Sequence, residues 1–183
     1  MNAFTTNASL VLCPVEPSWV PENLAALSKF LQETGLAGDP LHQDENSFSV
    51  NEHFLEHISF MGCSPNIKFN NENDDGKFTF IRLTLTPTIT ALTGSHSFAP
   101  HCPQCKKADK NWREHLKDHR LHCGHCRQTS EAWQYNWRKS AGFGRCFIEI
   151  TDIYPKEAIP QPSLLLALEN RFQLAWKYFF YYP

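Results

Sequence analysis

Four cysteines in two Cys-x-x-Cys pairs constrain this chain more than any other feature of its sequence. The pairs are Cys102-Pro-Gln-Cys105 and Cys123-Gly-His-Cys126, and seventeen residues separate them. Two intervening residues allow a tight turn to aim both sulfurs at one point, and proline and glycine favour such turns. The spacing predicts a closed, structural zinc site in which all four thiolates are ligands. An iron–sulfur cluster and a redox dithiol are the alternatives.

The two pairs resemble the knuckles of the zinc-ribbon superfamily, and the resemblance covers residues 98–130 only. It implies a β-hairpin scaffold, and members of this superfamily bind DNA, RNA or protein. Many of their knuckles place glycine directly after the second cysteine, whereas Lys106 and Arg127 stand there in this chain. Because Asn111 and Glu114 favour a helix start in the spacer, a treble-clef-like arrangement is the alternative.

The other three of the seven cysteines are Cys13, Cys63 and Cys146, and we expect them to be buried apolar side chains. The first residues carry no basic segment typical of an export signal, and no apolar stretch approaches the length of a membrane span. We therefore expect a cytoplasmic protein that does not enter a membrane. In that compartment, metal binding or free thiols are more common than disulfides.

Two segments alternate apolar and polar residues with a period of two, which predicts strands over 77–86 and 144–153. The cysteine pairs lie between them. We expect the two strands to be neighbours in a small antiparallel sheet that is flanked by helices, with the metal-binding segment as an excursion. The predicted fold class is therefore α+β, with a single domain over 1–183 and an inserted zinc-binding module at 98–130.

Further elements are predicted from proline and glycine punctuation and from apolar stripes. The last residues, 176–182, are unusually aromatic and suit either a final core strand or a docking surface for a partner. The expected elements are a strand at 9–15, helices at 21–31, 50–61 and 163–177, a polar loop at 38–46 and a turn at 70–76.

Charge is distributed unevenly along the chain. The formal net charge is only −2, yet residues 100–145 contain ten Lys or Arg against four Asp or Glu. The remainder of the chain is correspondingly acidic. Such asymmetry indicates a cationic surface that meets an anionic partner, either nucleic acid or an acidic protein.

Aromatic and basic side chains interleave over residues 132–145. Rings stack on bases and cations neutralise phosphates, so this mixture favours single-stranded nucleic acid. Alternatively, the aromatics pack the metal module against the sheet while the charges are solvated. The candidate nucleic-acid-binding residues are Lys106, Lys107, Arg113, Arg120, Arg127, Arg138, Lys139 and Arg145, with Trp112, Trp133 and Trp137 as candidates for stacking.

Histidines are also concentrated near the cysteines. His115, His119 and His122 are spaced so that a helix would align them on one face, where they could bind a second metal. The simpler interpretation, which we favour, is that they are solvated polar residues on an exposed helix.

The sequence leaves three classes of function open. The first is a non-enzymatic protein that recognises an anionic partner, with RNA or DNA as the leading candidate. The second is a protein-interaction or assembly factor whose zinc is purely structural. The third is an enzyme that uses His53, Glu56 and His57 for acid–base chemistry. Exposed tryptophans beside the basic residues would favour the first class, whereas buried tryptophans would weaken it.

Overall fold

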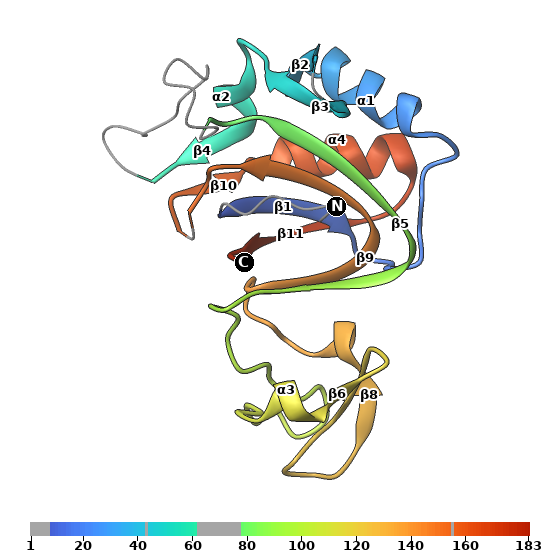
Figure 1. Ribbon diagram of the computed structural model, residues 1–183, viewed down its shortest axis with the longest axis vertical. Coiled ribbons are helices and arrows are strands. Elements are labelled where there is room, and N and C mark those ends of the chain that lie inside the picture. The colour runs from blue at the N-terminus through green and yellow to red at the C-terminus, as the bar shows by residue number, and fades with distance from the viewer. Residues whose placement is uncertain (1–7, 43, 62–77, 155) are drawn as a thin grey trace.

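The computed structural model describes residues 8–42, 44–61, 78–154 and 156–183. Its centre is a six-stranded sheet in which every pair of neighbours is antiparallel (Figure 1). Helices accompany this sheet, so the predicted α+β class is confirmed. In order across the sheet, the strands are β11 (Trp176–Tyr181), β1 (Ser9–Pro14), β9 (Ala141–Thr151), β5 (Ile81–Thr93), β3 (Asp44–Val50) and β2 (Ala37–Leu41).

Strands β5 and β9 form the long central pair, which confirms the predicted pairing on either side of the cysteines. Their register shifts between Leu85 and Thr90, where β5 carries more residues than β9 and includes Pro87. A bulge accommodates proline, which has no N–H to donate to a ladder. Both strands bend, and residues 94–140 extend from their end, away from the rest of the sheet (Figure 1).

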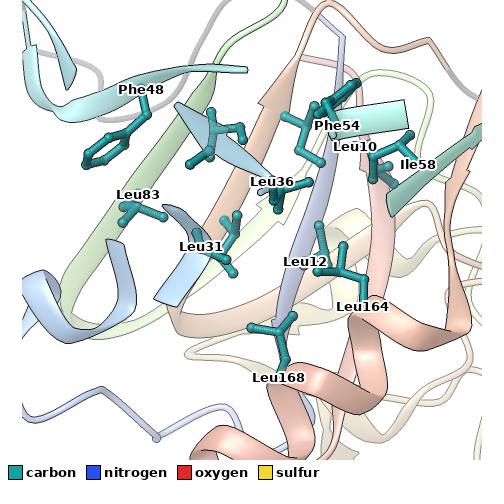
Figure 2. Packing of buried hydrophobic residues seen from close by; sticks show 14 of the residues in the cluster. Leu10, Leu12, Leu31, Leu36, Phe48, Phe54, Ile58, Leu83, Leu164 and Leu168 are labelled. Atoms are coloured by element: carbon teal, nitrogen blue, oxygen red, sulfur yellow. The ribbon is translucent and has the colours of Figure 1, made fainter. Parts of the chain in front are cut away.

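Two helices cover one face of the sheet and bury leucines against it (Figure 2). Helix α1 spans Leu24–Glu33, and the Asn23 side chain caps it by accepting a hydrogen bond from its backbone. Helix α4 spans Pro162–Phe172. None of the helices in the described part of the chain is long and apolar enough to cross a membrane. Residues at the centre of this main core include Leu10, Leu12, Leu27, Leu31, Ile148, Ile150, Leu164 and Leu168.

The predicted helix over 50–61 is wrong over most of its length. The structure contains a single helical turn, α2 (Phe54–His57), followed directly by strand β4 (Ile58–Phe60). Strand β4 pairs with β10 (Ala158–Pro160) in a separate two-stranded sheet. Met61, the last residue of the predicted helix, is exposed. Pairing with a distant strand therefore outweighed the local helical pattern.

Two other boundaries also differ from the prediction. Residues 38–46, expected to be a polar loop, lie mostly in the β2–β3 hairpin at the sheet edge. The last helix ends at Phe172 because Gln173 takes a left-handed backbone conformation, with φ of 56°. The aromatic tail then forms β11. The turn predicted at 70–76 lies outside the described residues.

The opposite face of the sheet carries a smaller cluster that includes Cys13 and Phe147. Cys146 lies in the main core, so both described cysteines outside the pairs are buried, as expected. Burial raises the pKa of the Cys13 and Cys146 thiols to about 12, so neither thiol ionises readily. Cys63 lies outside the described residues.

The segment between β5 and β9 has a small sheet of its own. Three short strands pair in sequence order, and the second Cys-x-x-Cys pair lies between the last two. Its elements are helix α3 (Trp112–His115), strands β6 (Leu116–Lys117), β7 (Arg120–His122) and β8 (Thr129–Glu131), and the 3₁₀ helix η1 (Ala132–Gln134).

Candidate functional site

Each Cys-x-x-Cys pair closes a turn with the same set of backbone hydrogen bonds. In each pair, the carbonyl oxygen of the first cysteine accepts a hydrogen bond from the backbone N–H of the residue four positions later. The backbone N–H of the same cysteine donates a hydrogen bond to the carbonyl oxygen of the residue five positions later. The four donor–acceptor distances are 2.9 to 3.0 Å. The two turns therefore repeat one local geometry. The partners are Lys106 and Lys107 for Cys102, and Arg127 and Gln128 for Cys123.

The residue after each pair has a left-handed backbone, although it is not glycine. The φ angles are 60° at Lys106 and 62° at Arg127. The sequence departs here from the glycine of many zinc-ribbon knuckles, but the backbone takes the conformation that glycine would favour. Both side chains are exposed, so each turn presents a cation to solvent.

The two turns bring four sulfurs together, with all of them within 4.8 Å of one another. The Sγ–Sγ distance is 3.7 Å both between Cys102 and Cys126 and between Cys105 and Cys123. Four thiolates placed tetrahedrally at about 2.3 Å from one ion lie about 3.8 Å apart. A disulfide would require about 2.05 Å. The geometry fits a single metal ion with four cysteine ligands.

The thiols also receive hydrogen bonds from the turns that carry them. The N–H groups of Gln104 and His125 each lie 3.4 Å from the sulfur of the first cysteine in their pair. Burial raises the pKa of Cys102, but backbone and thiol hydrogen bonds outweigh it and lower this pKa to about 7. Burial raises the pKa of Cys123 to about 11. Thiolates are the form that binds a metal, and the charge of a metal ion would offset the repulsion among four of them.

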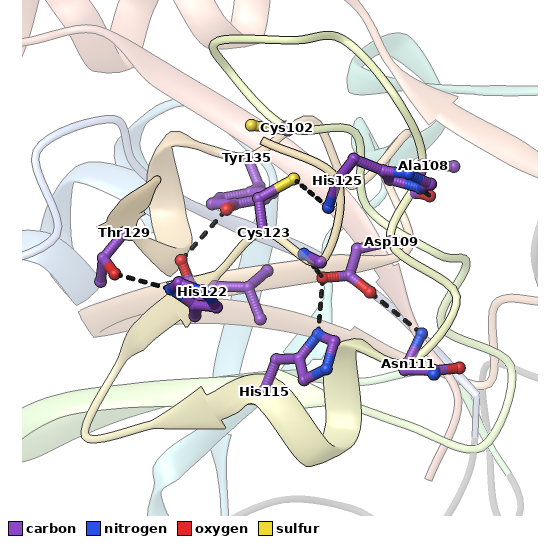
Figure 3. Close-up of polar contacts among 12 residues, drawn as sticks. Cys102, Ala108, Asp109, Asn111, His115, His122, Cys123, His125, Thr129 and Tyr135 are labelled. Carbon is purple, nitrogen blue, oxygen red and sulfur yellow. Dashed lines mark hydrogen bonds and ion pairs between the residues drawn. The ribbon is translucent and has the colours of Figure 1, made fainter. Parts of the chain in front are cut away.

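A buried carboxylate, which sequence reasoning missed, supports the second turn (Figure 3). Asp109 is only 3% exposed, and its Oδ2 lies 2.9 Å from Nδ1 of His115. Its Oδ1 accepts a hydrogen bond from the N–H of Asn111 at 3.0 Å. The His115 ring lies against Gly124, where an added Cβ would be 3.2 Å from Cε1. Asp109 thereby fixes the ring that packs on the second pair.

The predicted face of three histidines is wrong, because the spacer is helical only over α3. His115 lies at the end of that turn, His119 lies at a left-handed φ of 62° between β6 and β7, and His122 lies on β7. The ring of His122 contacts the Thr129 hydroxyl at 3.1 Å (Figure 3). Among the described residues, the four cysteines are the only group of three or more side chains placed so that they could hold a metal ion together.

An aromatic core lies between the cysteine cluster and the sheet. Trp112 and Trp137 are 3% and 5% exposed, and their rings meet edge to face at 4.8 Å. Trp137 also lies 5.4 Å from Phe143 on β9. These two tryptophans therefore pack inside the protein's own core, and their burial argues against the expectation that they stack on bases. Tyr135 is buried beside them, whereas Trp133 is half-buried.

The eight predicted basic residues lie on the surface, with Arg145 half-buried and the rest exposed. Arg120 lies 3.7 Å from Glu131, and it is the only one of the eight with a carboxylate within ion-pair distance among the described residues. Three others lie over aromatic rings, at 3.9 to 4.6 Å from the ring centroids. These pairs are Arg113 with Trp112, Arg138 with Phe98, and Lys139 with Tyr178.

A groove of about 440 Å³ runs between the segment after η1 and strand β11. We call it the basic groove and define it by Trp133, Arg138, Lys139, Lys177 and Tyr178. No Asp or Glu lines it. Of the predicted residues, Trp133, Trp137, Arg138 and Lys139 line the groove and the others do not.

Sequence reasoning missed Lys177 and Tyr178 as groove residues, although it recognised the tail as aromatic. They meet the segment after η1 only because β11 pairs with β1 at the sheet edge. Trp176 of the same strand is buried in the main core, and Phe179 is buried in the smaller cluster on the opposite face of the sheet. Part of the tail is thus a core strand, and its outer edge forms one wall of the groove.

The residues considered for acid–base chemistry do not form one hydrogen-bonded set. His53 Nδ1 lies 2.9 Å from Glu56 Oε1, and both side chains are largely exposed. The hydrogen bond to Glu56 and its charge raise the pKa of His53. His57 instead contacts the Thr34 carbonyl oxygen through Nε2 at 2.6 Å. His53 and Glu56 thus form a surface ion pair, while the His57 ring is held separately by the Thr34 carbonyl oxygen.

Comparison of the chain with protein-family models, with curated proteins and with solved structures finds no match. The cysteine cluster and the basic groove are therefore the features from which a function can be proposed.

Proposed function

We propose that Cys102, Cys105, Cys123 and Cys126 bind one structural zinc ion in a zinc-ribbon-like module. We further propose that the zinc-loaded protein binds single-stranded RNA or DNA without catalysing a reaction. The observation that carries the second proposal is the basic groove, where three cations and two accessible aromatic side chains meet with no acidic neighbour.

The choice of zinc rests on the donor set and its geometry. Four thiolates in a closed, half-buried cage suit a structural zinc site. A [2Fe–2S] cluster binds its four cysteines on two irons and a [4Fe–4S] cluster binds them on four irons, so cysteines on different irons would lie further apart than the 4.8 Å that contains all four sulfurs here. Each cysteine turn lies within a short antiparallel pairing, as a ribbon knuckle does: His101 pairs with Ala108, and β7 pairs with β8. Metal analysis of the purified protein should find one zinc per chain.

Nucleic acid is favoured because the groove combines two kinds of contact. Phosphates need unpaired cations, and Arg138, Lys139 and Lys177 have no carboxylate among the residues that line the groove. Bases need accessible rings, and Trp133 and Tyr178 are only half-buried. Because Trp112 and Trp137 are buried, they are not available to stack on bases. The stacking residues of the proposal are therefore the groove residues Trp133 and Tyr178.

The test is fluorescence anisotropy of labelled single-stranded RNA and DNA with the zinc-loaded protein over a range of salt concentrations. We expect the log affinity to fall linearly with the log of the salt concentration, with a slope of about −0.7 for each phosphate contacted. Reversing the charges of Arg138 and Lys139 should make this slope shallower. Absence of binding at low salt by folded, zinc-loaded protein would refute the proposal.

A protein-interaction role is the second candidate, and the buried tryptophans favour it. A module whose aromatic side chains serve its own core leaves a mainly cationic exterior that suits an acidic protein surface. Strand β11 also lies at the edge of the sheet, although the backbone N–H of Phe180 is bonded to the Lys139 carbonyl oxygen. Salt-dependent binding to an acidic polypeptide, without binding to RNA or DNA, would favour this candidate.

A further inference from the structure

The turn at the rim of the basic groove has an unusual sequence for its backbone. Arg138 and Lys139 both have a left-handed backbone, with φ of 51° and 61°. The Ser140 N–H donates to the Trp137 carbonyl oxygen at 3.0 Å, which closes a four-residue turn. Positive φ at both central residues characterises a type I′ turn, where Asn-Gly is strongly preferred. Two long cationic side chains here cost stability relative to Asn-Gly, which supports a role for their charge at this place in the groove.

Contacts on both sides hold this turn in place. The side-chain oxygen of Asn136 accepts a hydrogen bond from the Arg138 N–H at 2.9 Å. The carbonyl oxygen of Lys139 accepts one from the Phe180 N–H of β11 at 2.8 Å. The turn is thus fixed against the strand that forms the other wall of the groove. The two cations start from a rigid backbone, which lowers the entropic cost of binding an anion.

Aromatic rings limit where the cationic groups can go. The Arg138 guanidinium lies 4.6 Å from the centroid of the Phe98 ring, and the Lys139 ammonium lies 3.9 Å from that of Tyr178. Lys139 Nζ also donates to the Tyr178 hydroxyl. Lys177 supplies a third cation from β11, and Trp133 supplies a half-buried ring from η1. Positive charge therefore lies directly beside ring surface.

We propose that the basic groove is a nucleotide subsite for one unpaired residue of a single strand. Arg138, Lys139 and Lys177 hold the phosphate at the rim, while the base packs against Trp133 and Tyr178. This inference rests on the proposed function and names the part of the surface that carries it. An acidic peptide would satisfy the cations, but its carboxylates make no use of the ring surface, so the groove fits a base with its phosphate better.

The turn itself provides the sharpest test. The double variant Arg138→Asn, Lys139→Gly places the preferred Asn-Gly sequence in the type I′ turn and removes two cations. We expect the full-length, zinc-loaded variant to melt no lower than the unaltered protein while it binds single-stranded RNA at least tenfold more weakly. The control is Lys156→Gly, which removes an exposed lysine at a φ of 70° in the loop before β10. It should leave the affinity unchanged.

A second measurement locates the base directly. Single-stranded RNA that contains 4-thiouridine would be crosslinked to the zinc-loaded protein by light, and the modified peptides identified by mass spectrometry. We expect crosslinks in η1 or β11, at Trp133 or Tyr178. Trp133→Ala should weaken binding several-fold and leave the salt slope unchanged, because a neutral ring displaces no counterions.

The outcomes separate this inference from the function on which it rests. If the unaltered protein binds RNA with the expected salt slope, but the turn variant binds equally well and crosslinks lie elsewhere, the groove inference is wrong and the proposed function stands. If the unaltered protein binds no nucleic acid at low salt, both are wrong. If the turn variant loses binding to polyglutamate and not to RNA, the groove recognises acidic protein instead.

Discussion

At the residue scale, several positions in this protein are set by backbone geometry and close packing rather than by side-chain chemistry. Lys106 and Arg127, each directly after a cysteine pair, have a left-handed backbone. Arg138 and Lys139, the two central residues of a turn, have the same conformation. A left-handed conformation costs a non-glycine residue roughly 1–2 kcal/mol. A cation is nevertheless present at each of these four positions, and all four side chains are exposed.

Gly142 illustrates close packing on β9, next to the groove. A Cβ at this position would lie 2.0 Å from Cε1 of Phe179, a ring that is 1% exposed and cannot move aside cheaply. We expect Gly142→Ala to lower the free energy of unfolding by about 1–3 kcal/mol, the usual cost of overpacking. Denaturant unfolding followed by far-ultraviolet circular dichroism would measure the change.

Gly144→Ala is the matched control, because it adds the same methyl group two residues further along the same strand. Its Cβ would meet Phe147 atoms at 3.5 Å, which is ordinary contact. An equal loss of stability in both variants would show that glycine is needed for the backbone of β9 and not for the Phe179 ring.

At the element scale, the two cysteine turns act as one ligand set. Metal affinity depends on pH because thiolates bind the ion and protons compete with it. The pKa of Cys102 is lowered to about 7, so this thiolate is available above that pH and is protonated below it. The other thiols release their protons when the ion binds. Acidification should therefore weaken binding, and alkaline pH should strengthen it.

We expect zinc affinity to fall between pH 8 and pH 6 by roughly a factor of ten per pH unit for each proton released on binding. Competition with a coloured chelator at each pH would measure the affinity. Circular dichroism at the same pH values would show that the sheet remains folded. An affinity that does not change over this range would mean that the thiols are not the ligands.

At the scale of the whole molecule, the chain builds two separate main packing centres on one pair of strands. The main core lies between the sheet and helices α1 and α4, and the aromatic core lies at the far end of β5 and β9, beside the cysteines. The bulge between Leu85 and Thr90 falls between the two. Because the cores share strands but few side chains, metal loss should affect them unequally.

Removing the metal, by chelation or by Cys102→Ser, should loosen residues 98–131 and leave the main core folded. Hydrogen–deuterium exchange would show lost protection in β7 and β8 with retained protection in β1 and β9. Cys13→Ala, which alters a buried cysteine outside the pairs, should keep its metal. Loss of protection throughout the chain would instead mean that the two cores unfold as one unit.

The sequence was most informative where local chain geometry decides the outcome. Cys-x-x-Cys is a turn that aims two sulfurs at one point, so its spacing was enough to predict the cluster that the structure contains. Alternation likewise predicted the two strands that became β5 and β9, because a period of two leaves little choice of structure, and the tendency of successive strands to be neighbours predicted their pairing. Helix α1 was predicted for a similar reason, since the proline before it, its leucine stripe and the glycine after it all lie within one short segment.

Tertiary structure decided the features that depend on residues far apart in the chain. Residues 58–60 formed strand β4 rather than the end of a helix because β10 was there to pair with them, and the histidines of the spacer were separated by β6 and β7. Whether a tryptophan is buried depends on what packs over it, so Trp112 and Trp137 could not be distinguished from Trp133 by sequence. The basic groove arises only because β11 pairs with β1 and brings Lys177 and Tyr178 to Arg138 and Lys139. The sequence thus determined the cysteine cluster through local turns, whereas the basic groove was decided by strand pairing across the length of the chain.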